Sequence, residues 1–315
     1  MYSENPARDA LRVTKAALMN QVARFTPGLY VGLTGQTGRG NEKDPPARIA
    51  AYFRRCFNEY MERLGVESGK EARFLRGRSV LEYGPGDVLG VALLMYAHGA
   101  SSVQCVDRFP LKRATDNNLQ AYRELIDTLG PEQRERACRA FVEYGEPESG
   151  FDPRAIAYAV TRDGLIGRTA AYDLIISRAV LEHVDRLDMT MDDMASALSR
   201  DGIAIHKVDL KSHGMDRYHP FDFLTWPEPV YRLMNSHKGN PNRWRVDKYR
   251  ELVERNHLRF KELEHTGRLE PEQIERIRPN LAAGFRDIPT EELSWLGFWM
   301  VLEHALPEPA PAVHA

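Results

Sequence analysis

The feature of this sequence best suited to chemistry is a glycine-rich turn that follows a carboxylate. Residues 79–90 read Ser-Val-Leu-Glu-Tyr-Gly-Pro-Gly-Asp-Val-Leu-Gly, so an apolar run ends at Glu82 and is followed by Gly84 and Gly86. Glycines between a strand and a helix let the backbone approach a ligand closely, because they have no Cβ. A helix N-terminus attracts phosphate, whereas a carboxylate beside it repels phosphate. The turn therefore favours a ligand that is cationic or neutral at this end.

Two further segments follow in the order of a parallel βαβ arrangement. Residues 102–107, Ser-Val-Gln-Cys-Val-Asp, form a short strand-like run that ends in Asp107. Residues 172–184 are typical of a buried parallel strand that leads into a helix. Each segment alone also fits an ordinary structural element, since many α/β folds use a glycine turn or a loop acid. The three segments in this order are a much stronger signal than any one of them.

Together the three segments resemble the class I S-adenosylmethionine (SAM) methyltransferases. The acid-x-Gly-x-Gly turn is similar to motif I of that family, which wraps the methionine part of SAM, and Asp107 matches the acid that holds the ribose hydroxyls. The resemblance also places Asp163 beside the adenine, after a third strand at 156–160. It implies a SAM-dependent methyltransferase that releases S-adenosylhomocysteine. The cofactor-binding residues it implies are Glu82, Tyr83, Gly84, Pro85, Gly86, Leu89, Asp107, Arg108, Asp163, Ser177, Arg178 and Ala179.

Three polar residues after the fourth and fifth strands are candidates for catalysis. Methyl transfer requires alignment of acceptor, methyl group and sulfur, and a hydroxyl or amine acceptor must also lose a proton. Ligands of open α/β sheets bind beyond the carboxyl ends of the strands, where His183, Asp209 and His213 follow in the sequence. We expect these three to act as base or acceptor contact. The alternative for each histidine is a hydrogen-bonded or solvated structural side chain, and strand alternation makes His206 a weaker candidate.

A metal ion is not expected, although His and Asp residues crowd one segment. The spacing of these residues matches no zinc motif, and Glu182-His183 is not part of a paired-His helix motif. The catechol-type methyltransferases hold magnesium through carboxylates and amides, so a divalent ion stays an alternative. The crowded positions are His206, Asp209, His213, Asp216, His219 and Asp222.

Basic residues gather in the segment 243–261, which by default is a solvated helix face. Asn242, Arg243 and Arg245 precede the expected helix, and a guanidinium there could hold a carboxylate or phosphate of the acceptor. We therefore expect these three to bind substrate. This part of the chain resembles bacterial methyltransferases that accompany polysaccharide and secondary-metabolite genes, a likeness that covers about residues 79–305. It implies a polar small-molecule or sugar-linked acceptor. Our hypothesis for such an acceptor favours oxygen over nitrogen as the methylated atom.

Composition limits the classes of partner. The 315 residues are 43% hydrophobic and 28% charged, as in a globular protein with a sizeable core. The net charge of −2 argues against a globally basic nucleic-acid binder. No stretch is long and apolar enough for a membrane span or signal peptide. Three widely spaced cysteines indicate reduced thiols, so we expect a cytoplasmic protein. No motif specifies an oligomeric state.

The pattern predicts an α/β protein with the Rossmann-like, seven-stranded sheet of class I methyltransferases, covered by helices on both faces. We expect a helical extension over residues 1–75, a methyltransferase domain over 76–306 with a long insertion after strand five, and a disordered tail over 307–315. Residues 28–46 are predicted to be a loop, either a lid near 32–40 or a passive connector. A turn at Asp201-Gly202 is expected before strand five.

Two other functions fit the same scaffold. A nicotinamide-dependent (NAD(P)) oxidoreductase would use a doubly wound sheet, but the position of Glu82 and the lack of a Tyr-x-x-x-Lys pair after strand four argue against it. A non-catalytic binding protein could have kept the fold. Glu82, Gly84, Gly86 and Asp107 are all present, which favours a working cofactor site.

Overall fold

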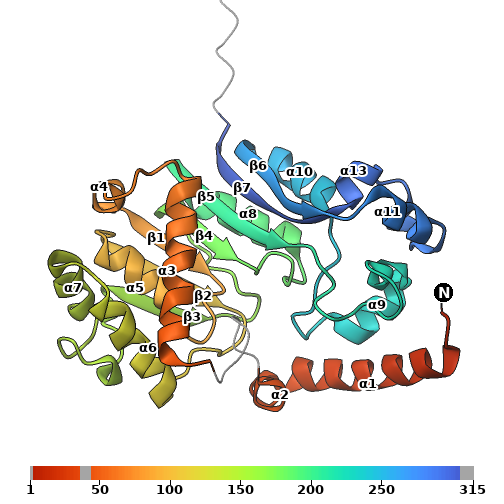
Figure 1. Cartoon of the computed structure of the whole chain (residues 1–315), viewed down its shortest axis with the longest axis horizontal. Helices are drawn as coiled ribbons and strands as arrows, with labels where there is room; N and C mark the ends of the chain where they lie inside the picture. The colour runs from red at the N-terminus through yellow and green to blue at the C-terminus, as the bar shows by residue number, and fades with distance from the viewer. Residues whose placement is uncertain (1–2, 36–43, 306–315) are drawn as a thin grey trace, which may run out of the picture.

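A mixed β-sheet forms the centre of the computed structural model, which describes residues 3–35 and 44–305 (Figure 1). Its strand order over these residues is β3-β2-β1-β4-β5-β7-β6; β7 runs antiparallel to its two neighbours and the other pairs are parallel. The predicted fold class is confirmed. The strands are β1 (Ser79–Tyr83), β2 (Ser102–Asp107), β3 (Ile156–Val160), β4 (Tyr172–Arg178), β5 (Leu198–Asp209), β6 (Leu258–Arg268) and β7 (Trp295–His304).

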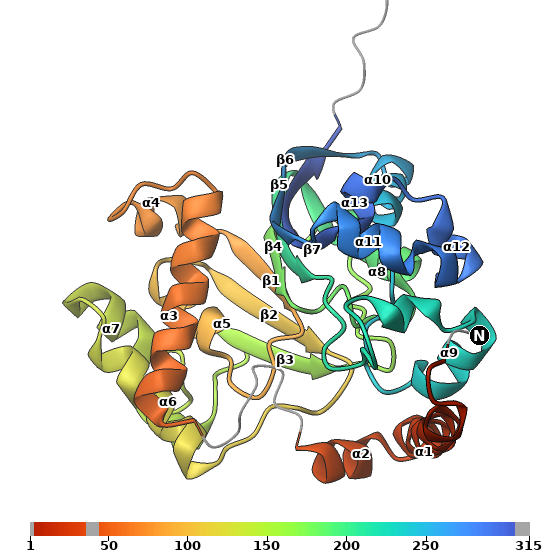
Figure 2. The same cartoon turned by 45° about the vertical axis from the view of Figure 1, so that its right-hand side comes forward.

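Helices cover both faces of the sheet, and strand alternation decides which side chain meets which layer (Figure 2). On β1, Val80 packs toward α3 (Pro46–Arg63), α5 (Gly90–Ala97), α6 (Asp116–Asp127) and α7 (Pro131–Cys138). Leu81 and Tyr83 pack toward α8 (Leu187–Ala197) and α10 (Val246–Arg255). The hydroxyl of Tyr83 donates to Asp193 of α8 at 2.6 Å. Glu82 therefore faces the α5 side, away from α8.

The first helix lies away from the sheet, against the segment inserted after β5 (Figure 1). The side-chain amide of Asn20 in α1 (Pro6–Phe25) donates to Leu233 O at 2.9 Å in α9 (Glu228–Asn235) and accepts from His237 N at 2.8 Å. Asp9 of α1 pairs with Arg217 at 2.7 Å, and both side chains are buried. The N-terminal helix and the insertion thus stabilise each other.

The helices of the C-terminal part form a third core with α9. They are α11 (Pro271–Ile277), α12 (Ala283–Arg286) and α13 (Thr290–Leu293). The short helix α4 (Glu71–Leu75) lies elsewhere in the chain, directly before β1. α3 shares the main core with β1 and α5, although the sequence placed it in the extension. No helix within residues 3–35 and 44–305 has the length and apolar character needed to cross a membrane. The tail expected at 307–315 lies outside the described residues.

Three local predictions differ from the structure. The segment expected to be a loop from residue 28 begins with α2 (Pro27–Thr34), because Pro27 suits the first turn of a helix and Gly35 ends it with a left-handed backbone. Residues 36–43, and most of the suggested lid, lie outside the described chain. Asp201 and Gly202 belong to β5, at an irregularity in its register with β4, instead of a turn. Residues 179–186 are irregular, and α8 begins only at Leu187.

Candidate functional site

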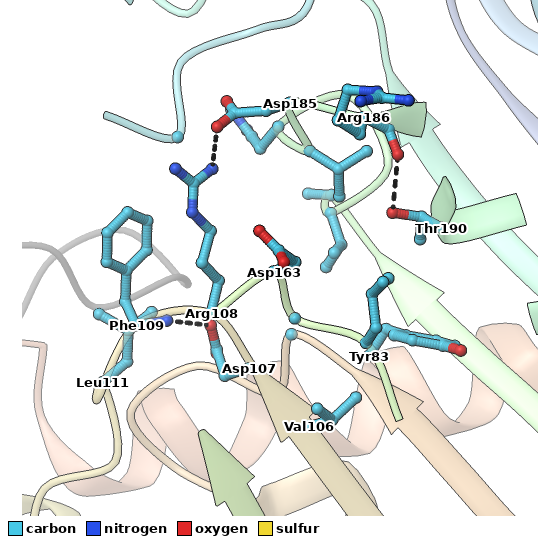
Figure 3. A pocket seen from close by; sticks show the side chains of 18 of the residues that line it. Tyr83, Val106, Asp107, Arg108, Phe109, Leu111, Asp163, Asp185, Arg186 and Thr190 are labelled. Atoms are coloured by element: carbon cyan, nitrogen blue, oxygen red, sulfur yellow. Dashed lines mark hydrogen bonds and ion pairs between the residues drawn. The ribbon is translucent and has the colours of Figure 1, made fainter. Parts of the chain in front are cut away.

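A cavity of about 620 Å³ opens at the carboxyl ends of β1, β2 and β4. The strand order reverses between β1 and β4, and their crossovers run on opposite faces, which leaves a crevice at this edge. Figure 3 shows side chains from the end of β2 and from the segment after β4 on opposite sides of the space, with the end of β1 at its edge. Thr34 and Gly35 from the end of α2 also line it. The topology alone therefore places one large site at this edge.

One end of the cavity combines a buried carboxylate with apolar side chains. Asp107 is 7% exposed, and its Oδ1 accepts from Phe109 N at 3.1 Å (Figure 3). Its Oδ2 is buried without a hydrogen-bond partner among the described residues. Burial raises the pKa of this carboxyl to about 6. Phe109 and Leu111 lie beside it. This end suits a ligand with hydroxyl donors next to a flat apolar group.

The glycine turn brings the ends of β1 and β4 into close approach. Gly84 has φ +61°, and a Cβ built there would lie 2.5 Å from Cγ2 of Val180. Both residues line the cavity. Ala179, just before Val180, also has a positive φ of 53°, which is uncommon without a glycine. Only glycine therefore fits at 84 without displacing Val180 of the cavity wall.

Glu82 lies beneath the turn and does not line the cavity. It is 7% exposed, the backbone N–H of Ala92 in the first turn of α5 hydrogen-bonds to it, and Cys105 Sγ lies 3.8 Å from its Oε2. Burial, and secondarily the charge of Asp107, raises its pKa to about 8. The carboxyl is thus mostly protonated at neutral pH. Direct binding of the cofactor by Glu82 stays a prediction.

The other end of the cavity carries two histidines. The rings of His183 and His213 lie 4.8 Å apart, edge to face, and both residues line the space. Burial, followed by the neighbouring His213, lowers the pKa of His183 to about 4, so this imidazole is neutral at pH 7. Glu182 is buried behind them, with Oε1 accepting from Asp209 N at 3.0 Å. A neutral imidazole offers a lone pair to a proton or to a metal ion.

Charged residues also line the cavity. Arg108 pairs with Asp185 at 2.7 Å, and Asp163 lies between this pair and Asp107 (Figure 3). Thr190, at the start of α8, donates to Arg186 O at 3.2 Å. The space is therefore polar along part of its wall, as expected where a polar ligand binds.

Comparison with known proteins decides the family. The family model described as "Methyltransferase domain" matches residues 51–287, well over half of the chain. The chain belongs to this methyltransferase family. It is a SAM-dependent methyltransferase, since SAM is the methyl donor of the family. The nicotinamide-dependent alternative is thereby removed. Among curated proteins, none matches the chain.

Solved structures of methyltransferases are also similar. A SAM-dependent methyltransferase from Mesorhizobium loti shares 17% identity at a TM-score of 0.40, covering 73% of this chain and 94% of that one. A TehB-like SAM-dependent methyltransferase from Corynebacterium glutamicum shares 16% at 0.37, covering 82% and 99%. Phosphoethanolamine N-methyltransferase 2 from Haemonchus contortus, in complex with SAM, shares 14% at 0.40, covering 73% and 49%. The assignment rests on the family match, not on these low scores.

The cavity of the methyltransferase fits SAM on one observation. The buried Oδ2 of Asp107 has no partner within the described chain, and such an atom is costly unless a ligand hydroxyl meets it. Of the residues predicted to bind cofactor or act in catalysis, the structure brings these to the cavity wall: Tyr83, Gly84, Asp107, Arg108, Asp163, Ala179, His183 and His213.

The other predicted cofactor and catalytic residues of the methyltransferase lie outside the lining. Gly86 is buried and does not line the cavity. Ser177 contacts His206 Nδ1 at 2.7 Å, and Arg178 pairs with Glu59 at 2.8 Å. These contacts belong to the sheet and α3. Also outside the lining are Glu82, Pro85, Leu89 and Asp209.

The predicted substrate-binding arginines require a correction. Arg245 is 1% exposed and donates to Leu210 O at 2.8 Å, to Leu293 O and to Trp295 O. Arg243 is 3% exposed and donates to Trp226 O and to Glu228. Both guanidinium groups are thus occupied in the core of the insertion. Asn242 likewise holds the loop after β4, through Leu181 O at 2.7 Å. None of the three lines the cavity.

Several residues of the cavity wall were not predicted from the sequence. Asp185 directly follows the segment 172–184, and its position as an acid after the fourth strand could have marked it as a candidate. In the structure it pairs with Arg108. Tyr52 of α3, Thr34 of α2 and Gly239 after α9 reach the cavity from distant parts of the chain. No local pattern marks these three, because only the tertiary fold brings them together.

The structural role of Arg245 is testable. We expect Arg245→Lys to lower the free energy of unfolding by about 1–2 kcal/mol, since an ammonium cannot reach all three carbonyls and each hydrogen bond contributes about 0.5–1.5 kcal/mol. Chemical denaturation measures this, and the affinity for SAM should stay unchanged. A substrate role would instead appear as a raised KM for the acceptor at wild-type stability.

Proposed function

We propose that this methyltransferase transfers the methyl group of SAM to an oxygen atom of a polar small-molecule or sugar-linked acceptor. The observation that carries the proposal is the division of the cavity, with Asp107 and apolar side chains at one end and His183 with His213 at the other. SAM supplies an electrophilic methyl group on a positively charged sulfur. The end with Asp107 would hold its nucleoside part, which leaves the histidine end to the acceptor.

The residues of the histidine end support oxygen as the methylated atom. A hydroxyl group must lose its proton during the reaction, so it needs a nearby group that accepts this proton or weakens the O–H bond. His183 is neutral at pH 7, because burial lowers its pKa to about 4, and a neutral imidazole has the lone pair for this role. His213 lies beside His183 and offers a second imidazole. We infer that the two imidazoles contact the nucleophilic atom of the acceptor.

The charged wall supports a polar acceptor. Arg108, Asp185 and Asp163 offer donors and acceptors of hydrogen bonds along the cavity (Figure 3). A sugar or a hydroxylated small molecule presents many such groups. The lining thus supports a compact, polyhydroxylated molecule.

A labelling experiment tests this proposal. The enzyme is incubated with SAM carrying an isotopic methyl label and with fractionated extracts of metabolites, polysaccharide, protein and nucleic acid. We expect label in a polar small molecule or a sugar-containing fraction, in an alkali-stable ether or an ester, and less label with Asp107→Ala when SAM is limiting. Label in protein or nucleic acid, or on nitrogen of the small-molecule product, would contradict the proposed acceptor.

A further inference from the structure

Three side chains gather at the histidine end of the cavity with the donor atoms of a metal site. Glu182, His183 and His213 each offer one such atom, and these atoms all lie within 4.8 Å of one another. Glu182 and His183 are neighbours in the irregular segment after β4, and His213 lies after β5 with a positive φ of 50°. The carboxyl ends of two adjacent parallel strands therefore bring the three together.

Two of the three residues carry a buried atom that lacks a hydrogen-bond partner in the described chain. These atoms are Oε2 of Glu182, a residue only 2% exposed, and Nδ1 of His183. An unsatisfied buried polar atom costs about 1–3 kcal/mol, and native proteins keep few of them without a ligand, ion or water to meet them. Two such atoms on neighbouring residues of the same three-residue cluster indicate a shared partner that is positively charged.

The surrounding contacts hold Glu182 in place for this role. Its Oε1 accepts from the backbone N–H of Asp209 at 3.0 Å, which fixes the carboxylate and leaves Oε2 available. A ligating carboxylate is commonly oriented by such a second hydrogen bond. The Glu182 side chain is therefore already held in position by the protein.

We propose that Glu182, His183 and His213 bind a divalent transition-metal ion. Two imidazoles and one carboxylate form the donor set of catalytic zinc and non-haem iron sites, which keep open positions for a substrate. Magnesium and calcium prefer sites made of oxygen ligands, so a transition metal fits this set better. The linear sequence hid the site, because Glu182-His183 and His213 are far apart along the chain and match no spacing motif.

The ion would face the acceptor, because both histidines line the cavity. This role rests on the proposed function, whereas the site itself does not. A hydroxyl oxygen bound at an open position becomes more acidic. Its O–H bond then breaks with the proton passing to water, the oxygen's electron pair forms the new bond to the methyl carbon, and the pair of the C–S bond stays on sulfur. His183 and His213 then act as ligands.

Binding of Zn²⁺ alone tests the site without SAM or acceptor. Tag-free protein is stripped with a chelator, dialysed against Zn²⁺ and assayed for metal per chain and for affinity. We expect one ion per chain in the wild type. His213→Ala and Glu182→Gln should each weaken binding at least about 10- to 100-fold, a loss already typical for outer-shell partners of a metal. His213 is exposed and its variant should fold, so the test does not depend on the buried Glu182.

His219→Ala is the matched control, because His219 is a half-buried histidine of the same segment that pairs with Glu4 at 3.2 Å. It should bind Zn²⁺ like the wild type. Equal affinity in wild type and His213→Ala, or no stoichiometric binding in the wild type, would overturn the site. Full methyl transfer by the chelator-stripped enzyme, with Zn²⁺ binding intact, would overturn the catalytic role while leaving methyl transfer itself established.

Discussion

Replacing His183 by alanine is expected to lower kcat by about 10²- to 10⁴-fold, the range for loss of a group that activates the nucleophile. His183 lines the cavity opposite Asp107 and contacts His213, so its loss removes the centre of the acceptor end. The Kd for SAM should stay within about twofold, because the Asp107 end is untouched. Steady-state kinetics with the acceptor found by isotopic labelling, together with calorimetric titration of SAM, measures both quantities.

The split between kcat and SAM affinity separates a catalytic role from a structural one. Loss of a purely structural histidine would change both kcat and the Kd for SAM, or would lower the melting temperature and leave both of them unchanged. His219→Ala should leave kcat and stability unchanged, since His219 pairs with Glu4 outside the cavity lining. Wild-type kcat in His183→Ala would show that the acceptor binds elsewhere, and the proposed division of the cavity would be wrong.

The strands could be predicted because each depends on local pattern. Val80 to Tyr83, Val103 to Val106 and Ile156 to Val160 are short apolar runs between turn residues, and each pairs in parallel with its neighbour as expected. The same local logic failed at Asp201-Gly202, since a strand with an irregular register contains residues that usually form turns. The pairing of β5 with β4, not the local turn propensity, decided the conformation of Asp201-Gly202.

A site residue could be predicted where the order of the strands fixes its position. It could not be predicted where the burial of the side chain decides what it binds. Asp107 ends a strand at the crevice, so its position followed from the order of segments. Glu82 has the right type and spacing, but alternation along β1 turns it toward α5. The charges of Arg243 and Arg245 were visible in the sequence, while their burial against backbone carbonyls was not.

Much of the cavity wall could not be predicted, because it is assembled from segments without a shared local pattern. Gly239 reaches the cavity from the insertion, while Thr34 comes from α2. Their approach depends on the docking of α1 onto α9 through Asn20. A sequence pattern describes one element at a time, so contacts made by two docked elements stay outside its reach.

Asp107→Ala is expected to weaken SAM binding by about 1–3 kcal/mol, or roughly 5- to 150-fold, the range for loss of a buried hydrogen-bond acceptor. Asp107 lines the cavity and keeps Oδ2 without a partner in the described chain, so a ligand hydroxyl has an acceptor waiting there. Isothermal titration with SAM and with S-adenosylhomocysteine measures the change. Unchanged affinity for both would show that the nucleoside does not bind at β2.

The pH dependence of SAM binding makes the case for Asp107 sharper. Burial raises its pKa to about 6, so the carboxyl is mostly ionised at pH 7 and mostly protonated at pH 5. The ionised form accepts hydrogen bonds from hydroxyls, and binding therefore stabilises that form. The Kd for SAM should rise by roughly tenfold between pH 7 and pH 5 in the wild type. Asp107→Asn keeps the shape but cannot ionise, so its Kd should be nearly constant over this interval. Glu82, with a pKa of about 8, changes its charge mainly above this interval and contributes little to the ratio. An equal rise in both proteins would trace the pH effect to another group and remove Asp107 as the ribose acceptor.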